Sequence, residues 1–152
     1  MEINDKLKNL SFQLDDDKII KDVELKNNLT IIYFYPKDDT PGCTKEAIDF
    51  TEYYEALKKM DVTILGISKD SIAKHRKFKE KYNIKFNLVS DDGTLCEAFK
   101  VWVEKSMYGK KYMGIQRATF LIDKKLKILK IWRNVKVKGH VEEVYNFIKS
   151  LD

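Results

Sequence analysis

IIYFYPKDDTPGCT, residues 31–44, joins an apolar run, a short polar loop and a helix start. The aromatic and β-branched run predicts a buried strand that ends at Pro36. Thr40 is a preferred N-cap residue, and Pro41 suits the first helical position, where no backbone N–H is required. The stretch therefore predicts a strand, a loop and a helix that begins at Pro41.

Cys43 falls near the third position of that helix. Backbone N–H groups and the positive end of the helix dipole converge there and stabilise an anion. Thiols at helix N-termini ionise more easily than free thiols, and the thiolate is the nucleophilic form. We therefore expect Cys43 to be reactive.

The whole chain has 152 residues, the size of one ordinary domain, so we expect residues 1–152 to form a single domain. Hydrophobic residues make up 43% and charged residues 35%, which is typical of a soluble globular protein. No window has the roughly 18 uncharged apolar residues that a membrane helix needs. Because the N-terminus also lacks the apolar core of a secretory signal, the sequence predicts no membrane association and a cytoplasmic location.

The cysteines and the charge of the chain exclude several classes of function. Its two cysteines, Cys43 and Cys96, form no CxxC or metal-ligand pattern, which favours reactive or buried thiols over a structural disulfide. The missing CxxC also excludes a thioredoxin-like disulfide oxidoreductase. The net charge of +5 comes from 29 basic and 24 acidic residues spread along the chain, so we expect no nucleic-acid partner. The three consecutive aspartates at 15–17 are interpreted as a turn rather than a metal site.

The order of the predicted elements indicates the fold class. In chain order we expect a small β-hairpin within 1–28, a strand at 29–35, a helix at 43–60, a strand at 62–67, a helix from 70 or 71 to 82, a strand at 86–89, a short helix at 95–101, a long loop at 103–115, a strand at 116–123, its hairpin partner at 126–133 and a helix from 139. This order predicts a mixed central sheet flanked by helices, in which the βαβ units are right-handed and mostly parallel and an antiparallel hairpin lies at one side. Ligands in such sheets bind at the carboxyl ends of strands, where residues 40–43 lie.

These residues resemble a known family. The pattern Pro36-x-x-x-Thr40-x-x-Cys43 is similar to the active-site motif of peroxiredoxins. The longer stretches FYPKDDTPGCT at 34–44 and GIQRATFLID at 114–123 resemble the bacterioferritin comigratory protein (PrxQ) subfamily, and the resemblance covers nearly the whole chain. It implies an α/β, thioredoxin-like, three-layer α/β/α sandwich with a central mixed sheet and an N-terminal β-hairpin. It also implies a thiol-dependent peroxidase that reduces hydrogen peroxide and organic hydroperoxides without a metal or other cofactor.

The resemblance assigns roles to four residues. Cys43 is the nucleophile that becomes a sulfenic acid, Thr40 positions the peroxide through its hydroxyl, and Pro36 shields the site from water. Arg117 holds the thiolate and the peroxide by charge-assisted hydrogen bonds. The chemistry itself requires donors aimed at the developing charge, and the backbone N–H groups of Gly42 and Cys43 add to them.

The chain departs from the subfamily in its resolving cysteine. The position five residues after Cys43 is Ile48, and the alternative position in the next helix lies near Lys79. Cys96 is either a small buried residue or an unusual resolving cysteine. We expect a one-cysteine cycle in which thioredoxin, glutaredoxin or a small-molecule thiol reduces the sulfenic acid. The resemblance implies a monomer or a small homodimer.

Other titratable residues have simpler interpretations. Glu46 is interpreted as a helix-surface acid or an arginine partner rather than a general base. His75 and His140 are expected at the surface or its boundary. The main functional alternative is a peroxide-sensing redox relay or binding protein that uses the same Cys43 without significant turnover.

Overall fold

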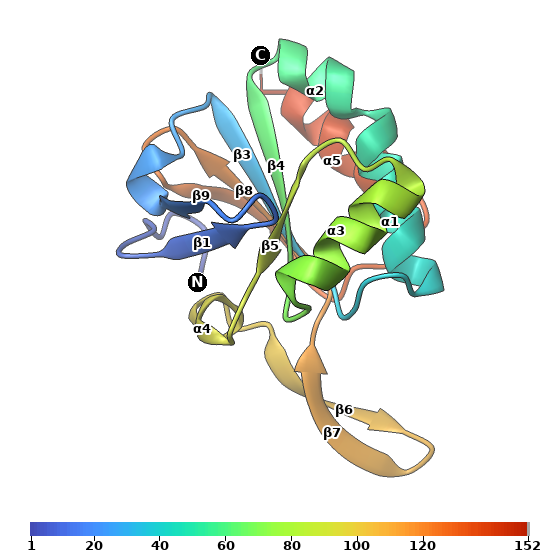
Figure 1. Cartoon of the computed structure of the whole chain (residues 1–152). Helices are drawn as coiled ribbons and strands as arrows, with labels where there is room; N and C mark the ends of the chain where they lie inside the picture. The colour runs from blue at the N-terminus through green and yellow to red at the C-terminus, as the bar shows by residue number, and fades with distance from the viewer. Residues whose placement is uncertain (152) are drawn as a thin grey trace.

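The computed structural model describes residues 1–151 and contains one seven-stranded sheet and one separate hairpin (Figure 1). The main sheet has the order β2-β1-β5-β4-β3-β8-β9. Its strands are β1 (Ser11–Leu14), β2 (Ile19–Lys21), β3 (Leu29–Phe34), β4 (Val62–Ser68), β5 (Asn87–Ser90), β8 (Ala118–Asp123) and β9 (Ile128–Trp132). The hairpin consists of β6 (Trp102–Met107) and β7 (Lys110–Ile115). The helices are η1 (Asp22–Glu24), α1 (Pro41–Glu52), α2 (Tyr54–Lys59), α3 (Ile72–Tyr82), α4 (Thr94–Ala98) and α5 (His140–Lys149).

Strand β3 lies inside the sheet, between β4 and β8, and all six of its residues are buried. It runs parallel to β4, with Ile31 opposite Ile64, and antiparallel to β8, with Ile31 opposite Leu121. A strand covered on both faces is expected to be a nearly continuous apolar run, as 29–35 is apart from Thr30. The predicted mixed sheet, the N-terminal hairpin β1–β2 and the hairpin β8–β9 are confirmed.

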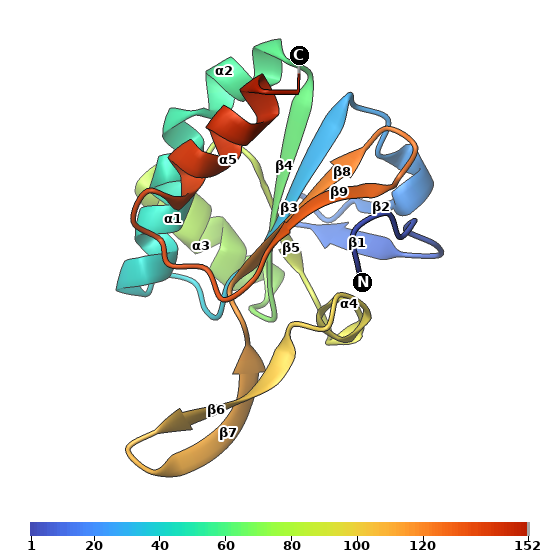
Figure 2. The ribbon, with the colours of Figure 1, turned by 180° about the vertical axis from the view of Figure 1, so that it is seen from behind.

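The two faces of the sheet are covered unequally. Helices α1, α2, α3 and α5 all pack on one face, as the two opposite views show (Figures 1 and 2). The other face is covered by α4 and by the segments around the N-terminal hairpin, through residues such as Leu7, Leu25 and Phe99. Alternating residues of β3 supply both cores, with Tyr33 on the α1 face and Phe34 on the α4 face. The helices flank the sheet as predicted, in layers of different thickness.

The segment 103–115 is not the predicted long loop; it is the antiparallel hairpin β6–β7. Its turn consists of Tyr108 and Gly109, whose φ angles of 51° and 78° match the two-residue turns that favour hairpins. The sequence pattern is weak because most of the hairpin is exposed. Neither of its strands needs the apolar alternation by which a half-buried strand is recognised.

The predicted helices are confirmed with small changes at their ends. The expected helix 43–60 divides at Tyr53 into α1 and α2. Ser71, rather than Asp70, caps α3, and its hydroxyl oxygen accepts a hydrogen bond from the backbone N–H of Lys74 at 3.2 Å. Within residues 1–151, no helix is long and apolar enough to cross a membrane.

Candidate active site

Cys43 occupies the third position of α1, as the sequence predicted. Thr40 is the N-cap with extended backbone angles (φ −99°, ψ 154°), and Pro41 is the first helical residue. The Thr40 hydroxyl does not cap the helix; it donates a hydrogen bond to the carbonyl of Lys37 at 2.9 Å. The residue Cys43 is 2% exposed, so its thiol lies beneath the surface at the helix start.

Arg117 contacts Cys43 directly. Its Nη2 donates to Cys43 Sγ at 3.3 Å, and its Nη1 donates to Glu46 Oε1 at 2.7 Å. Arg117 and Cys43 are 74 positions apart in the chain, but Arg117 immediately precedes β8, which pairs with β3. The pairing of Phe34 with Ala118 therefore places the guanidinium against the first turn of α1.

Gly42 allows Arg117 to approach the start of α1 closely. A Cβ atom on Gly42 would lie 3.2 Å from Arg117 Nη2. That distance is tighter than ordinary van der Waals contact, so a side chain there would push the guanidinium away from the thiol. Gly42 thus leaves room for the cation over the start of the helix.

Glu46 is the arginine partner foreseen as one alternative, and it is not on the helix surface. Its side chain is fully buried, and its Oε2 has no hydrogen-bond partner among the described residues. Burial raises the pKa of Glu46 to about 7, although Arg117 opposes that rise. Burial alone would lower the pKa of Arg117, but the charges of Glu46 and Cys43 raise it above its ordinary value. Arg117 is therefore held as a cation by both of its partners.

A buried polar network fixes the loop between β3 and α1. Asp38 Oδ1 accepts a hydrogen bond from the Tyr35 hydroxyl at 2.5 Å, and Asp38 Oδ2 lies 2.6 Å from His75 Nδ1. His75 Nε2 lies 2.9 Å from the carbonyl of Val89. Both ring nitrogens of His75 therefore have a polar partner, one on the loop and one on β5. The loop that leads to Cys43 is thus tied to α3.

The surface interpretation of His75 was therefore wrong, and Asp38 was missed. The signal for His75 was present, because Ile72, His75 and Phe78 share the helical spacing of one buried face. No sequence signal identified Asp38, since it lies within a short polar loop. A second tie joins the same loop to α3, where Asp39 accepts hydrogen bonds from Lys81 Nζ at 2.9 Å and from the Tyr82 hydroxyl at 2.6 Å.

His140 is also buried, contrary to expectation. Its Nε2 lies 2.8 Å from the Thr119 hydroxyl oxygen, and its ring packs edge-on against Trp132. Burial lowers the pKa of His140 to about 4, and the positive charge of Arg117 adds to this. His140 is therefore neutral near pH 7 and belongs to the core beneath the site.

Cys96 lies in the core on the opposite face of the sheet from Cys43. Its backbone N–H donates to Asp91 Oδ2 at 2.9 Å, and burial together with Asp91 raises the pKa of its thiol far above the ordinary range. A thiol that stays protonated is a poor nucleophile.

The structure brings Cys43, Thr40, Arg117, Gly42 and the half-buried Pro36 to one region, and it leaves Cys96 apart. Within residues 1–151, no cluster of His, Cys, Asp or Glu is arranged to hold a metal ion.

Glu46 and His140 should give opposite slopes to stability against pH. The folded pKa of Glu46, about 7, exceeds its ordinary 4.5, so the folded state retains a proton that the unfolded state loses. Stability from this group therefore falls by about 3 kcal/mol as pH rises from 4.5 to 7, at about 1.4 kcal/mol per pKa unit. The pKa of His140 is lowered from 6.5 in the unfolded chain to about 4 in the folded one. The stability that neutral His140 contributes is therefore lost as pH falls from 6.5 to 4.

We expect Glu46→Gln to remove the fall in stability with rising pH that Glu46 causes, and to leave the rise that His140 causes. Urea unfolding of this variant between pH 4 and pH 7 should then show stability that rises with pH. Glu52→Gln, an exposed change in the same helix, is the matched control and should keep the wild-type profile. A Glu46→Gln profile identical to that of the control would contradict the raised pKa of Glu46.

The chain is similar throughout its length to known proteins. The model of the AhpC/TSA family matches residues 3–131. The peroxiredoxin Bcp of Bacillus subtilis is 47% identical over 152 residues, which cover 99% of this chain and 97% of that protein. The peroxiredoxin Bcp of Escherichia coli is 40% identical over 136 residues, which cover 89% of this chain and 87% of that protein.

Solved structures agree with these relatives. A mutant of Xylella fastidiosa PrxQ has a TM-score of 0.94 and 40% identity, with 99% of this chain and 96% of that chain covered. The Xanthomonas campestris bacterioferritin comigratory protein, described for its alkyl peroxide reduction activity, has a TM-score of 0.89 and 39% identity, with 96% and 98% covered. Both the fold and the family resemblance deduced from residues 34–44 and 114–123 are confirmed.

Proposed function

Because the chain belongs to the AhpC/TSA family and is a thiol-dependent peroxidase, we propose that Cys43 is its peroxidatic cysteine and that Arg117 activates it. The observation that carries this assignment is the hydrogen bond from Arg117 Nη2 to Cys43 Sγ at 3.3 Å. A guanidinium and a helix N-terminus aimed at one sulfur favour its thiolate. Cys96 is also the third residue of a helix, α4, but there the Asp91 carboxylate accepts the backbone N–H groups of Leu95 and Cys96 and disfavours a thiolate, so the nucleophile is Cys43.

The proposed reaction oxidises Cys43 and reduces the peroxide. The thiolate attacks the hydroxyl oxygen of a hydroperoxide, a sulfur–oxygen bond forms and the oxygen–oxygen bond breaks. The bonding electron pair leaves on the alkoxide, or on hydroxide when the substrate is hydrogen peroxide, and that anion takes a proton from water. Arg117 and the backbone N–H groups at the start of α1 stabilise the charge as it moves from sulfur to oxygen. Cys43 is left as a sulfenic acid.

Two further residues complete the proposed substrate site. Thr40 presents its hydroxyl oxygen at the helix start, while its proton is engaged by the Lys37 carbonyl. That arrangement leaves oxygen lone pairs free to accept a hydrogen bond from the hydroperoxide. Pro36, half-buried at the end of β3, has no backbone N–H to attract water and shields the thiolate.

We further propose a one-cysteine cycle. Ile48 occupies the usual resolving position, and Cys96 lies in the core on the other face of the sheet. A disulfide needs Cα atoms within about 7 Å, so a bond between cysteines in the two cores would first require local unfolding. The sulfenic acid instead condenses with an external thiol, releases water and forms a mixed disulfide. A second thiol, from thioredoxin or another reductant, then frees Cys43.

Mass spectrometry of the intact chain after one equivalent of hydrogen peroxide tests this cycle. We expect a gain of one oxygen atom, and a mixed disulfide when a thiol is added, because no second cysteine can reach the sulfenic acid. The Cys96→Ser variant is the control and should give the same masses. A loss of two hydrogens in the wild type, absent in Cys96→Ser, would instead identify an internal disulfide.

The domain organisation, location and partners of the protein complete the assignment. We propose that residues 1–152 act as a single cytoplasmic domain, monomeric or as a small homodimer, without nucleic-acid partners. Catalytic turnover distinguishes the peroxidase from the alternative of a redox relay that uses Cys43 without turnover. Sustained consumption of hydrogen peroxide with thioredoxin, its reductase and NADPH is expected of the peroxidase, whereas a relay would stop after one equivalent.

A further inference from the structure

The hairpin β6–β7 stands apart from the main sheet and carries exposed apolar side chains. Both views show it extending from the end of the sheet where β3 leads into α1 (Figures 1 and 2). Four large apolar side chains of the hairpin are exposed: Met107 by 56%, Tyr108 by 99%, Tyr112 by 44% and Met113 by 50%. An isolated two-stranded ribbon is marginally stable, and exposed apolar residues that share a face mark interaction sites, as Met107 and Tyr112 do.

The strand register divides the hairpin into two faces with different charge. One, here called the Lys105 face, contains the cross-strand pairs Val103–Gly114, Lys105–Tyr112 and Met107–Lys110. The other, called the Glu104 face, contains Trp102–Ile115, Glu104–Met113 and Ser106–Lys111. Glu104 lies 3.6 Å from Lys111, so charge is balanced on that face. The Lys105 face has two lysines and no acid.

The Lys105 face adjoins the site of Cys43. A Cβ atom built on Gly114 would meet Lys105 Cδ at 3.3 Å and Tyr112 Cε2 at 3.4 Å, so both side chains lean toward the base of the hairpin. Burial and the charge of Arg117 lower the pKa of Lys105, while the charge of Cys43 opposes this. The Lys105 ammonium group therefore lies within the electrostatic field of both active-site residues.

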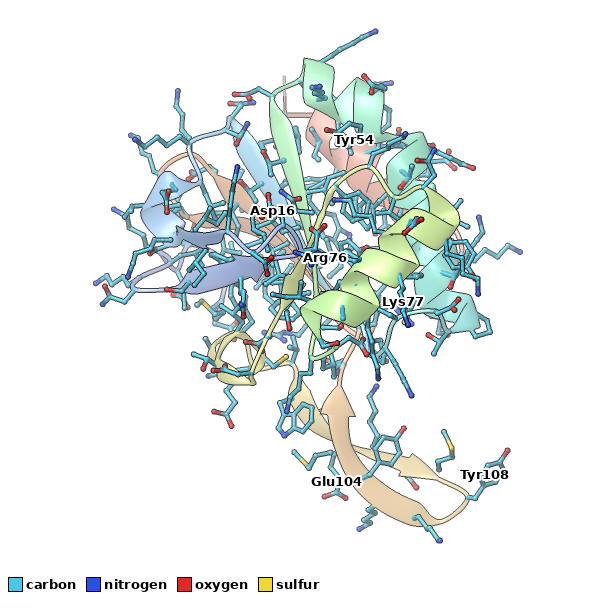
Figure 3. The ribbon with its side chains drawn as sticks, in the orientation of Figure 1. Asp16, Tyr54, Arg76, Lys77, Glu104 and Tyr108 are labelled. Atoms are coloured by element: carbon cyan, nitrogen blue, oxygen red, sulfur yellow. The ribbon has the colours of Figure 1, made fainter. Side chains whose placement is uncertain are left out.

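The base of the hairpin is fixed to the site by the backbone. The N–H of Gln116 donates to the carbonyl of Val101 at 2.7 Å, where the two strands meet the body. Arg117 is the next residue, and its guanidinium contacts Cys43 Sγ. A molecule bound along the Lys105 face would therefore end beside the sulfenic acid. Tyr108 marks the far end of this surface, at the hairpin tip (Figure 3).

We propose that the Lys105 face is the docking surface for the protein that reduces oxidised Cys43: a dithiol reductase of the thioredoxin type with acidic and apolar residues around its exposed thiol. The inference rests on the proposed one-cysteine cycle, which requires an external thiol at Cys43. Met107 and Tyr112 supply apolar contact of the kind enriched in interfaces, and methionine adapts to a partner's shape. Lys105 and Lys110 complement acidic residues, which favours encounter and orientation.

The test changes one face and uses the other as its control. The double variant Met107→Ser/Lys110→Glu removes apolar contact and reverses a charge on the Lys105 face. Met113→Ser/Lys111→Glu makes the same two changes on the Glu104 face. Each variant and the wild type are assayed with hydrogen peroxide, first with a bacterial thioredoxin, its reductase and NADPH, and then with dithiothreitol as the only reductant.

We expect the Lys105-face variant to raise the KM for thioredoxin by about tenfold or more, as loss of a complementary charge and an apolar contact does. Its turnover with dithiothreitol should equal that of the wild type, because a small thiol needs no docking surface. The Glu104-face variant should match the wild type with both reductants. Unchanged dithiothreitol turnover also shows that each variant is folded.

Three outcomes would overturn the inference. One is an equal KM for thioredoxin in both variants, and another is wild-type turnover with dithiothreitol but none with thioredoxin. The third is a wild-type dimer that the Lys105-face variant converts to a monomer, which would assign this face to a second copy of the chain. If the wild type turned over with neither thioredoxin nor dithiothreitol, the proposed function itself would be contradicted, which keeps the two failures distinct.

Discussion

Cys43→Ser should abolish peroxide consumption with every thiol reductant, whereas Cys96→Ser should keep wild-type turnover. Serine at position 43 cannot form a comparable nucleophile at neutral pH, because its hydroxyl stays protonated where a thiol ionises. Cys96 lies in the other core, with a raised pKa that keeps its thiol protonated. The measurement is the initial rate of NADPH oxidation coupled through thioredoxin, with dithiothreitol as a second reductant.

Each cysteine variant is the control for the other, because both substitutions replace a buried thiol by a hydroxyl. Circular dichroism and urea unfolding should show that both variants are folded at the assay temperature. Retention of wild-type activity by Cys43→Ser would refute the assignment of the nucleophile. A loss of turnover confined to Cys96→Ser, with folding intact, would show that Cys96 takes part in resolution.

Arg117→Met should lower kcat/KM by about 100- to 1,000-fold, the usual cost of losing one donor to a developing charge. Arg117 donates at once to Cys43 Sγ and Glu46 Oε1, so its loss affects both the thiolate and the buried carboxyl. Above pH 7 the Glu46 carboxylate would be left unpaired, and breaking such a buried pair costs about 3–5 kcal/mol. The stability loss should therefore be smaller at pH 5, where Glu46 is protonated in the folded state.

Arg117→Lys is the informative comparison for this prediction. Lysine keeps the charge, but its single nitrogen cannot occupy the positions of both Nη1 and Nη2, from which Arg117 donates to Glu46 and to Cys43. We expect it to recover part of the stability and little of the rate. Stopped-flow measurement of Cys43 oxidation isolates the first step from recycling. If both Arg117 variants oxidised Cys43 at the wild-type rate, Arg117 would have no part in activating the thiolate.

Local sequence was sufficient for the elements that surround the nucleophile. The strand at 29–35, the N-cap at Thr40 and the third helical position of Cys43 depend on interactions between near neighbours in the chain. Turn chemistry predicted the hairpin around 15–17 in the same way. The hairpin β6–β7 was missed because its exposed strands lack the apolar alternation that marks a half-buried strand.

The burial of polar side chains could be recognised only in the tertiary structure. Glu46 and His75 are titratable residues of the kind that usually lie at the surface, and only partners distant in the chain explain their burial. Arg117 and Asp38 are those partners, and each meets its residue across more than 35 positions of sequence. No local pattern encodes such a pair, because its stability depends on two elements that come together only in the folded sheet.

The sequence by itself determined the attacking half of the site: a cysteine in the first turn of a helix, followed far downstream by an arginine that the family resemblance identified. Only the tertiary structure decided what surrounds it. The pairing of β3 with β8 placed Arg117 on Cys43, and the sheet separated Cys96 from both. The physical reason is that side chains alternate across a strand, so the face on which a residue lies, and the partners it meets there, are fixed by strand order and register.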